Sequence, residues 1–393
     1  MRVAMFSRFP ADADQPKGGV ESATVGIARG LGTRADVDLH IVTLEKGRND
    51  DAVEDCGFAT VHRLAGGRLP MIVDVFNGPG RRKVDRYIRG LNPDVVHFQE
   101  TYGFGGPVKG VPTVFTVHGF DSLNLVTERQ YLWYLRAPLW RLAEKKGISS
   151  HRHLVSIAPY VTEQLRELGL SAEIVSIPNA ISREFFSVPD ATVPGRVLFA
   201  GWINPRKNLA TAISAVSRLV QLGKDVTLHA AGDFVDRDYT EKVRRLIAES
   251  GLGERVKLLG RVSQERLRQE LAEAAVFLLP SLQENAPMAI AEAMAAGVPV
   301  VTSNVCGMPT MVDEGRTGFL VEPRNIGQVA ERVEAVIGDP GRRQQMSAEA
   351  RRHALETWHP DAVVEQTLAL YRRIAGEART GAAVTPVARQ ERA

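Results

Sequence analysis

Two glutamates, Glu284 and Glu292, lie in a segment whose residue types predict a short helix directly after a buried strand. Asn285 is a favourable N-cap, Pro287 fits the first turn, and Gly297 ends the helix. The first turn of a helix leaves backbone N–H groups unpaired and carries about half a positive charge. Such a helix start binds anions, so we expect a phosphate group there.

The spacing of the two glutamates suits a ligand of a particular length. Their separation is at most about 12 Å if every residue between them is helical. This is close to the span from a sugar ring to a ribose across a pyrophosphate, so both carboxylates are placed to contact one nucleotide-sugar. The alternative is that Glu284 only stabilises the helix N-terminus and Glu292 is solvated. Glu292 lies in the apolar run AIAEAMAAG, where an unpaired carboxylate is costly, and this favours a binding role.

Other candidate residues lie where predicted strands end. Arg206 and Lys207 follow one strand and precede a helix, where they offer a planar guanidinium and a compact ammonium to phosphate. Their alternative role is a solvated basic turn. His118 ends a strand in the other half of the chain and can point into a cleft, although a lone histidine at such a place is more often structural. The Gly18-Gly19 pair predicts either a loop that approaches a ligand closely or a plain turn.

The elements that must position these residues form two series of alternating strands and helices. Short β-rich runs alternate with longer amphipathic runs, which is typical of parallel sheets with crossover helices. In doubly wound domains the ligand-binding loops lie beyond the carboxyl ends of the strands. We predict a Rossmann-like domain over 1–180, a linker over 181–195, a second Rossmann-like domain over 196–360, a helix over 361–376 that packs back towards the first domain, and a flexible tail over 377–393.

Composition limits the possible functions. A chain of 393 residues predicts two or three domains, and a net charge of +3 is too small for the whole surface to bind nucleic acid. Cys56 and Cys306 are far apart and predict neither a disulfide framework nor a zinc site. The sequence shows no signal peptide and no membrane-spanning run, which predicts a cytoplasmic protein, at most peripheral at the inner face of the membrane.

Several motifs together resemble a known family. The segment from Pro280 to Val321 holds the two glutamates, then EAMAAGVPVV, GMPTMVDEG and TGFLV. Further matches are the Gly18-Gly19 loop, VHGFD, IPNAI, AGWINPRKN and AAGD, in that order along the chain. This set resembles the signature of the retaining glycosyltransferases of family four, which have the GT-B fold. The resemblance implies an α/β fold of two doubly wound Rossmann-like domains that face each other across a cleft.

The resemblance also implies roles for individual residues. Lys207 matches a lysine that binds the donor phosphate, Glu292 matches a glutamate that binds the ribose hydroxyls, and Glu284 and His118 match residues that face the transferred sugar. Trp202 stands where the family usually has arginine, so one expected phosphate contact is in question, and Arg206 is its possible substitute. The implied donor contacts are Arg206, Lys207, Glu284, Asn285, Met288, Ala289, Glu292 and Gly19; the nucleobase region is Arg261 and Val262; the acceptor region is Gly18, Gly19, His118 and Asp121.

The predicted activity is the transfer of a sugar from a nucleoside diphosphate sugar, with UDP as the expected carrier, to an acceptor hydroxyl with retention of configuration. The acceptor is unknown and is a sugar, a lipid-linked glycan or a small molecule. The expected setting is the biosynthesis of bacterial glycans or glycoconjugates. No acidic DxD pair stands in a donor loop, so we expect neither a metal nor a cofactor. Two alternatives stay open: a sugar-nucleotide epimerase on the same scaffold, and a non-catalytic two-domain sugar-binding protein.

The segment 128–147 carries an unusual concentration of aromatic and basic residues, including Trp133, Tyr134 and Trp140. On a single helix such residues can bind an anionic membrane surface or an amphiphilic acceptor. The alternative is that the aromatic side chains pack on the sheet while the cations face water.

Overall fold

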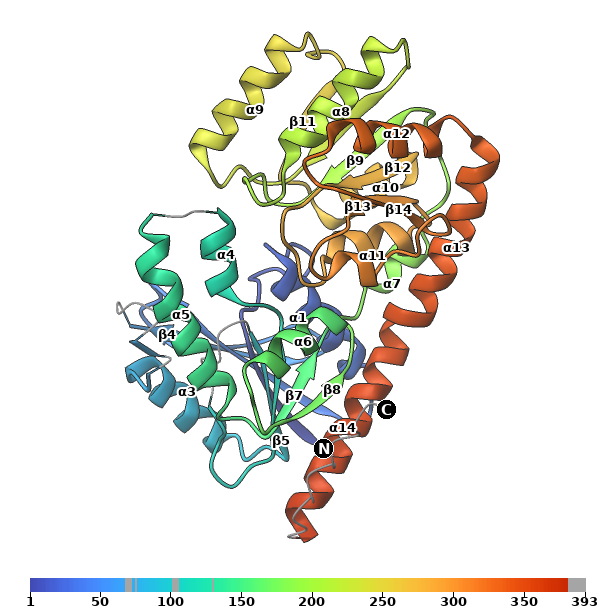
Figure 1. Ribbon diagram of the computed structural model, residues 1–393. Helices are drawn as coiled ribbons and strands as arrows, with labels where there is room; N and C mark the ends of the chain where they lie inside the picture. Colours follow the sequence, from blue (N-terminus) through green and yellow to red (C-terminus); the bar gives the residue numbers. More distant parts are fainter. Residues whose placement is uncertain (68–72, 75, 101–105, 129–130, 381–393) are drawn as a thin grey trace, which may run out of the picture.

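The computed structural model describes residues 1–67, 73–74, 76–100, 106–128 and 131–380, which form two lobes (Figure 1). The first lobe contains β1 (Arg2–Ser7), α1 (Gly19–Gly32), β2 (Asp38–Lys46), β3 (Ala52–Asp55), β4 (Thr60–Gly66), α3 (Pro79–Gly90), β5 (Val95–Glu100), β6 (Thr113–Val117), α4 (Asp121–Glu128), α5 (Trp133–Ile148), β7 (His153–Ser156), α6 (Pro159–Glu167) and β8 (Glu173–Ser176). In these described residues, no helix is both long enough and apolar enough to cross a bilayer.

The first sheet has eight strands in the order β3-β4-β2-β1-β5-β6-β7-β8. Its strands pair in parallel except β3, which runs antiparallel to β4 at the edge. The chain order reverses between β1 and β5, so the loops after these two strands diverge and leave a crevice at the carboxyl edge of the sheet. The loop after β1 ends at Gly18, Gly19 begins α1, and β5 brings Gln99 to the same edge.

The second lobe contains α7 (Arg183–Phe186), β9 (Arg196–Ala200), α8 (Leu209–Gln221), β10 (Thr227–Ala231), α9 (Arg237–Glu249), β11 (Val256–Gly260), α10 (Gln264–Glu273), β12 (Val276–Leu279), α11 (Met288–Ala295), β13 (Val300–Ser303), the 3₁₀ turn η1 (Met308–Thr310), β14 (Gly318–Val321), α12 (Ile326–Ile337) and α13 (Pro340–Trp358). Its six parallel strands have the order β11-β10-β9-β12-β13-β14. The order reverses between β9 and β12, and the loops after these strands carry Lys207 and Glu284.

The apolar sequence of the central strands follows from burial on both faces. All four residues of β12, VFLL, are fully buried, and helices cover both sides of each sheet. A strand buried on both faces cannot alternate polar and apolar residues, so it is a continuous apolar run. The predicted α/β fold class is confirmed. The apolar runs 3–7, 95–98, 197–200 and 276–279, which the sequence predicts as strands, correspond to β1, β5, β9 and β12.

The chain crosses between the lobes twice and ends on the first. The two crossings touch where the amide of Ile181 donates a hydrogen bond to the carbonyl of Trp358, 3.0 Å away. The last helix, α14 (Pro360–Thr380), then packs along α1 of the first lobe (Figure 1). Its Val364 and Tyr371 are buried in the core of that lobe. The tail predicted from 377 is therefore helical as far as Thr380, and 381–393 lie outside the described residues.

The segment 128–147 is not one helix, contrary to the prediction. Glu128 ends α4, the next two residues lie outside the described part, and α5 begins at Trp133. Leu132 adopts a left-handed conformation, with φ of 53°, which an α-helix cannot continue through.

Candidate active site

A cavity of about 380 Å³ lies between the two lobes and is lined by both. It is bounded by the loops at the carboxyl ends of the strands, as expected for two facing doubly wound sheets. Asp121, the first residue of α4, does not line it, although Asn124 of the same helix does. The other candidate residues do line it: Gly18, Gly19, His118, Arg206, Lys207, Arg261, Val262, Glu284, Asn285, Met288, Ala289 and Glu292.

Arg206 and Lys207 share one carboxylate. Nζ of Lys207 lies 2.8 Å from Oε1 of Glu284, and Arg206 forms an ion pair with the same oxygen. Arg206 also reaches the first lobe, where its Nε donates to Oε1 of Glu128, 3.0 Å away. Glu284 therefore meets the two cations rather than open space, and a phosphate that binds here must share or replace its contacts.

Burial controls the charge of this cluster. It lowers the pKa of Lys207, and the charge of Glu284 opposes the effect. Burial alone would raise the pKa of Glu284, but Arg206 and Lys207 outweigh it, so the pKa of this carboxyl lies below its ordinary value. The positive charges of Arg206 and Lys207 are paired with the negative charges of Glu284 and Glu128.

The start of α11 differs from the prediction. The helix begins at Met288, and Pro287, in an extended conformation, takes the N-cap position that we predicted for Asn285. The side chain of Asn285 instead donates from Nδ2 to the carbonyl oxygen of His118, 3.2 Å away across the cleft. The amides of Met288 and Ala289 have no hydrogen-bond partner among the described residues, as expected for a first turn. The first turn of α11 thus offers the amides of Met288 and Ala289 to a ligand in the cleft.

A glycine holds the turn before α11 in place. The amide of Gly307 donates to the carbonyl of Glu284, 2.9 Å away. A Cβ on Gly307 would lie 1.6 Å from the carbonyl oxygen of Asn285, so no other residue fits without moving the turn. The GMPT motif that follows β13 therefore positions the residues that line the cleft.

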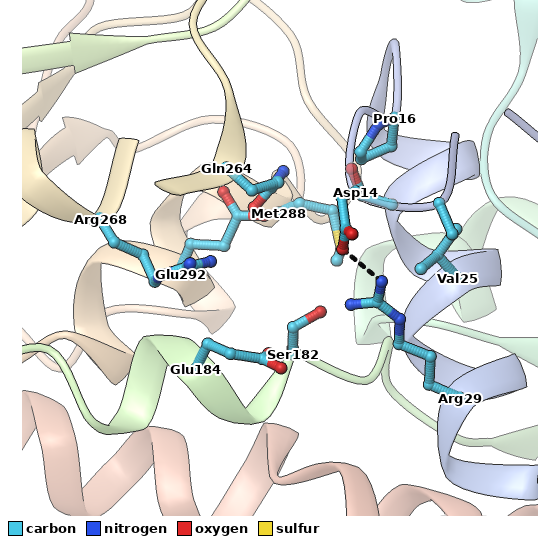
Figure 2. Close-up of a pocket in the computed structure, with 12 residues that line it drawn as sticks. Asp14, Pro16, Val25, Arg29, Ser182, Glu184, Gln264, Arg268, Met288 and Glu292 are labelled. Atoms are coloured by element: carbon cyan, nitrogen blue, oxygen red, sulfur yellow. Dashed lines mark hydrogen bonds and ion pairs between the residues drawn. The ribbon is translucent and has the colours of Figure 1, made fainter. Parts of the chain in front are cut away.

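Glu292 lies on α11, and its buried carboxylate is available to accept hydrogen bonds from a ligand. It is 7% exposed and has no hydrogen-bond or ion-pair partner among the described residues. Burial raises its pKa to about 7, and the charge of Lys207 opposes this. Glu292 also borders a smaller cavity of about 90 Å³, in which Figure 2 shows it across from Arg29 and Ser182. A buried carboxylate that borders two cavities is suited to accept hydrogen bonds from ligand hydroxyls.

His118 is held by hydrogen bonds at its ring and at its backbone carbonyl. Its Nε2 lies 2.6 Å from Oε1 of Gln99, a buried residue of β5 that the sequence did not indicate. Its carbonyl accepts the hydrogen bond from Asn285 of the other lobe. Burial lowers the pKa of His118 to about 4, so the ring is neutral at physiological pH.

Trp202 bridges the lobes. Its Nε1 donates to the carbonyl of Lys17, 3.0 Å away, and its ring lies over Gly18, where a Cβ would approach Cζ2 to 3.3 Å. Gly18 itself is extended, with φ of 176°, so its lack of a side chain gives the ring room and does not serve an unusual backbone conformation. Arg261 makes a second contact of this kind between the lobes: its Nη2 donates a hydrogen bond to the carbonyl of Gln15, 3.0 Å away.

Comparison with known proteins agrees with this arrangement. Residues 17–185 match Glycosyltransferase Family 4, and residues 182–353 match Glycosyl transferases group 1. Alpha-D-kanosaminyltransferase of Streptomyces kanamyceticus is 30% identical over 68% of this chain and 72% of its own length. The chain belongs to the family 4 glycosyltransferases.

Other similar proteins extend the same finding. The MMP alpha-(1->4)-mannosyltransferase of Mycolicibacterium hassiacum is 27% identical to this glycosyltransferase over 71% of the chain and 70% of that protein. Sucrose-phosphate synthase from Thermosynechococcus elongatus has the same fold, with a TM-score of 0.79, 20% identity and coverage of 95% of this chain and 99% of that one. The Anabaena HepE complex with UDP-glucose matches with a TM-score of 0.72, 18% identity and coverage of 95% and 100%.

This glycosyltransferase therefore has the GT-B fold, and the sugar comes from a sugar-nucleotide donor. Its family membership favours the transferase over the epimerase and the sugar-binding protein.

Proposed function

We propose that this glycosyltransferase moves a sugar from a nucleoside diphosphate, with UDP as the first candidate, to an acceptor hydroxyl with retention of the anomeric configuration. The observation that carries the proposal is the convergence of Lys207, Arg206 and the amides at the start of α11 on the cavity that Glu292 also lines. Cations and unpaired amides fit a diphosphate, and a buried free carboxylate fits ribose hydroxyls.

The donor is oriented along this row of groups. Its ribose binds Glu292, its diphosphate binds Met288, Ala289 and Lys207, and its sugar lies between Glu284 and His118. Solved structures of the same fold include HepE with UDP-glucose, which supports UDP as the first nucleotide to test.

The bond between the anomeric carbon and the diphosphate oxygen breaks, and its electron pair stays on that oxygen. Lys207, Arg206 and the α11 amides stabilise the new charge, because they are already in place and largely shielded from water. The acceptor oxygen bonds to the anomeric carbon from the same face. Its proton passes to the departing diphosphate oxygen, so no separate base is needed and configuration is retained.

We also propose that the reaction needs no metal ion, since two cations and the helix start already face the diphosphate. Addition of a chelator should leave the rate unchanged. Activity that is lost with chelator and restored by magnesium would contradict this part of the mechanism.

The deciding experiment offers the purified protein UDP-, GDP-, ADP- and dTDP-sugars and follows thermal protection and nucleotide release by mass spectrometry. We expect one nucleotide class to protect the protein, and release to need an acceptor. Product formed from donor alone would favour an epimerase. NMR of the anomeric proton of the product shows whether configuration is retained.

A peripheral membrane contact through α5 is a second part of this proposal. Tyr131 is 82% exposed and Tyr134 is 58% exposed, so the alternative in which the aromatic side chains pack on the sheet is wrong for these residues. Exposed cations lie among them, and Glu144, the one acidic residue of 131–148, is buried. An apolar and basic surface fits an anionic bilayer. Sedimentation with liposomes tests this contact.

A further inference from the structure

We infer that Gln99 is a positioning residue for sugar transfer, because it holds the His118 ring so that Nδ1 accepts a hydrogen bond from a hydroxyl of the bound substrate. The inference rests on the proposed function and adds a residue that the family motifs do not include. Gln99 lies on β5, next to the point where the order of the first sheet reverses.

The geometry fixes which nitrogen carries the proton. Oε1 of Gln99 is a carbonyl oxygen and can only accept, so at 2.6 Å from Nε2 of His118 it requires an N–H there. A neutral imidazole has one N–H, which leaves Nδ1 as an acceptor. Nδ1 has no hydrogen-bond partner among the described residues, and His118 lines the cleft.

Gln99 itself is buried, and its backbone is held in the sheet. It is 4% exposed, and its backbone carbonyl accepts a hydrogen bond from Oγ of Ser7 on the neighbouring strand, 3.2 Å away. His118 is in turn held from the second lobe by Asn285. The ring orientation is therefore set by β5 and the carbonyl position by the loop before α11, and both lobes must be in place for Nδ1 to meet the substrate.

The first test does not use activity. In full-length protein labelled with ¹⁵N-histidine, the nitrogen shifts of His118, assigned by comparison with His118→Ala, report which ring nitrogen is protonated. We expect the proton on Nε2 and an acceptor at Nδ1. A proton on Nδ1 would overturn the inference, even if the protein proves to be an active transferase.

The second test is a double-mutant cycle. Gln99→Leu should lower kcat about tenfold, the effect of one lost hydrogen bond of ordinary strength in the transition state. In the His118→Ala background the same change should have almost no effect, because Gln99 acts only through His118. Equal losses in both backgrounds would show that Gln99 only packs in the sheet. Thr116→Val, which removes a buried hydrogen bond to His97 on the adjacent strand, is the matched control and should leave kcat unchanged.

Gln99→Glu keeps an acceptor oxygen, and it tests the inference even if the Gln99→Leu protein fails to fold. Its carboxylate would stabilise the protonated ring, so kcat should approach the wild-type value at pH 8.5 and fall as the pH drops towards 6. His97 is the neighbouring titratable group that His118 influences, and it is unchanged in this variant. A pH profile identical to that of the wild type would contradict the inference. If the wild-type protein transfers sugar from none of the donors, the proposed function is refuted. The NMR measurement would then still decide which ring nitrogen of His118 is protonated.

Discussion

Nζ of Lys207 lies 2.8 Å from Oε1 of Glu284 in the lining of the interlobe cavity. Because Arg206 shares the same oxygen, the site holds its cations in place before any ligand arrives. A preorganised cation is more effective than a mobile one, since no rearrangement is needed when charge develops on the leaving group.

Lys207→Ala should therefore lower kcat by about 10²- to 10³-fold, the usual effect of removing one group that stabilises developing negative charge. The fold should persist, because Arg206 still neutralises Glu284. Steady-state kinetics with the preferred donor measure this effect. Lys242→Ala, an exposed lysine on α9, is the control. Near-normal turnover in Lys207→Ala would mean that the diphosphate binds elsewhere.

Glu292→Gln should bind the donor more weakly but stabilise the free protein in alkaline solution. The pKa of Glu292 is about 7 in the folded protein, against an ordinary 4.5. The native state thus binds the proton more tightly than the unfolded state, and stability falls as pH rises from 4.5 to 7. The destabilisation is on the order of 3 kcal/mol above pH 7 and is absent below pH 4.5.

Thermal melts at several pH values test this relationship. Tm of Glu292→Gln should exceed that of the wild type at pH 8, and the difference should disappear near pH 4.5. The donor KM should rise with little change in kcat, since ribose contacts change little during the reaction. The exposed Glu254→Gln is the matched control. A variant that is less stable than the wild type at pH 8 would contradict the buried, unpaired state of this carboxylate.

Trp202→Phe should loosen the loop after β1. The change keeps an aromatic ring over Gly18 but removes the N–H that binds the carbonyl of Lys17. Loss of one such hydrogen bond corresponds to about a fivefold rise in donor KM. Hydrogen exchange should quicken in the amides of 15–19 and nowhere else in the first lobe. Leu222→Ala, a change at an exposed residue directly after α8, should alter neither quantity. Unchanged exchange in 15–19 would show that the hydrogen bond from Trp202 does not hold this loop.

The exposed face of α5 predicts binding to anionic vesicles. Replacing Arg136, Arg141 and Lys145 by glutamine should weaken sedimentation with phosphatidylglycerol vesicles by about fivefold per cation, since each contributes about 1 kcal/mol. Replacing Leu135 and Leu139 by serine should weaken it as well, whereas Leu355→Ser on α13 should not. Equal binding to phosphatidylcholine and phosphatidylglycerol vesicles would contradict an electrostatic contact between α5 and the membrane.

Much of the fold was predictable because its signals are local. The apolar runs that became β9 and β12 can be recognised from a few consecutive residues, and so can the helix between Gly297 and the preceding strand. The edge strands β3 and β8 were not predicted. They are short, and their residues are largely exposed or half-buried, so no apolar pattern marks them.

The sequence predicted which residues form the site but not which contacts they make. Lys207, Glu284 and Glu292 follow from motif and spacing within one lobe. The contact of Arg206 with Glu128 and that of Trp202 with Lys17 join residues that are 78 and 185 positions apart in the chain. Periodicity and capping describe neighbours in sequence, so they carry no information on which loops meet across the cleft.

The hydrogen bond between Ile181 and Trp358 makes the two chain crossings a single pivot. The small cavity beside Glu292 is lined by Ser182 and Glu184, which adjoin this pivot, while α4 lies on the opposite side of the molecule (Figure 1). A rocking motion of the lobes about this pivot would move the residues beside Glu292 less than α4, which lies farther from it. If the ribose binds Glu292 as proposed, the nucleoside docks first and the reacting end of the site assembles last.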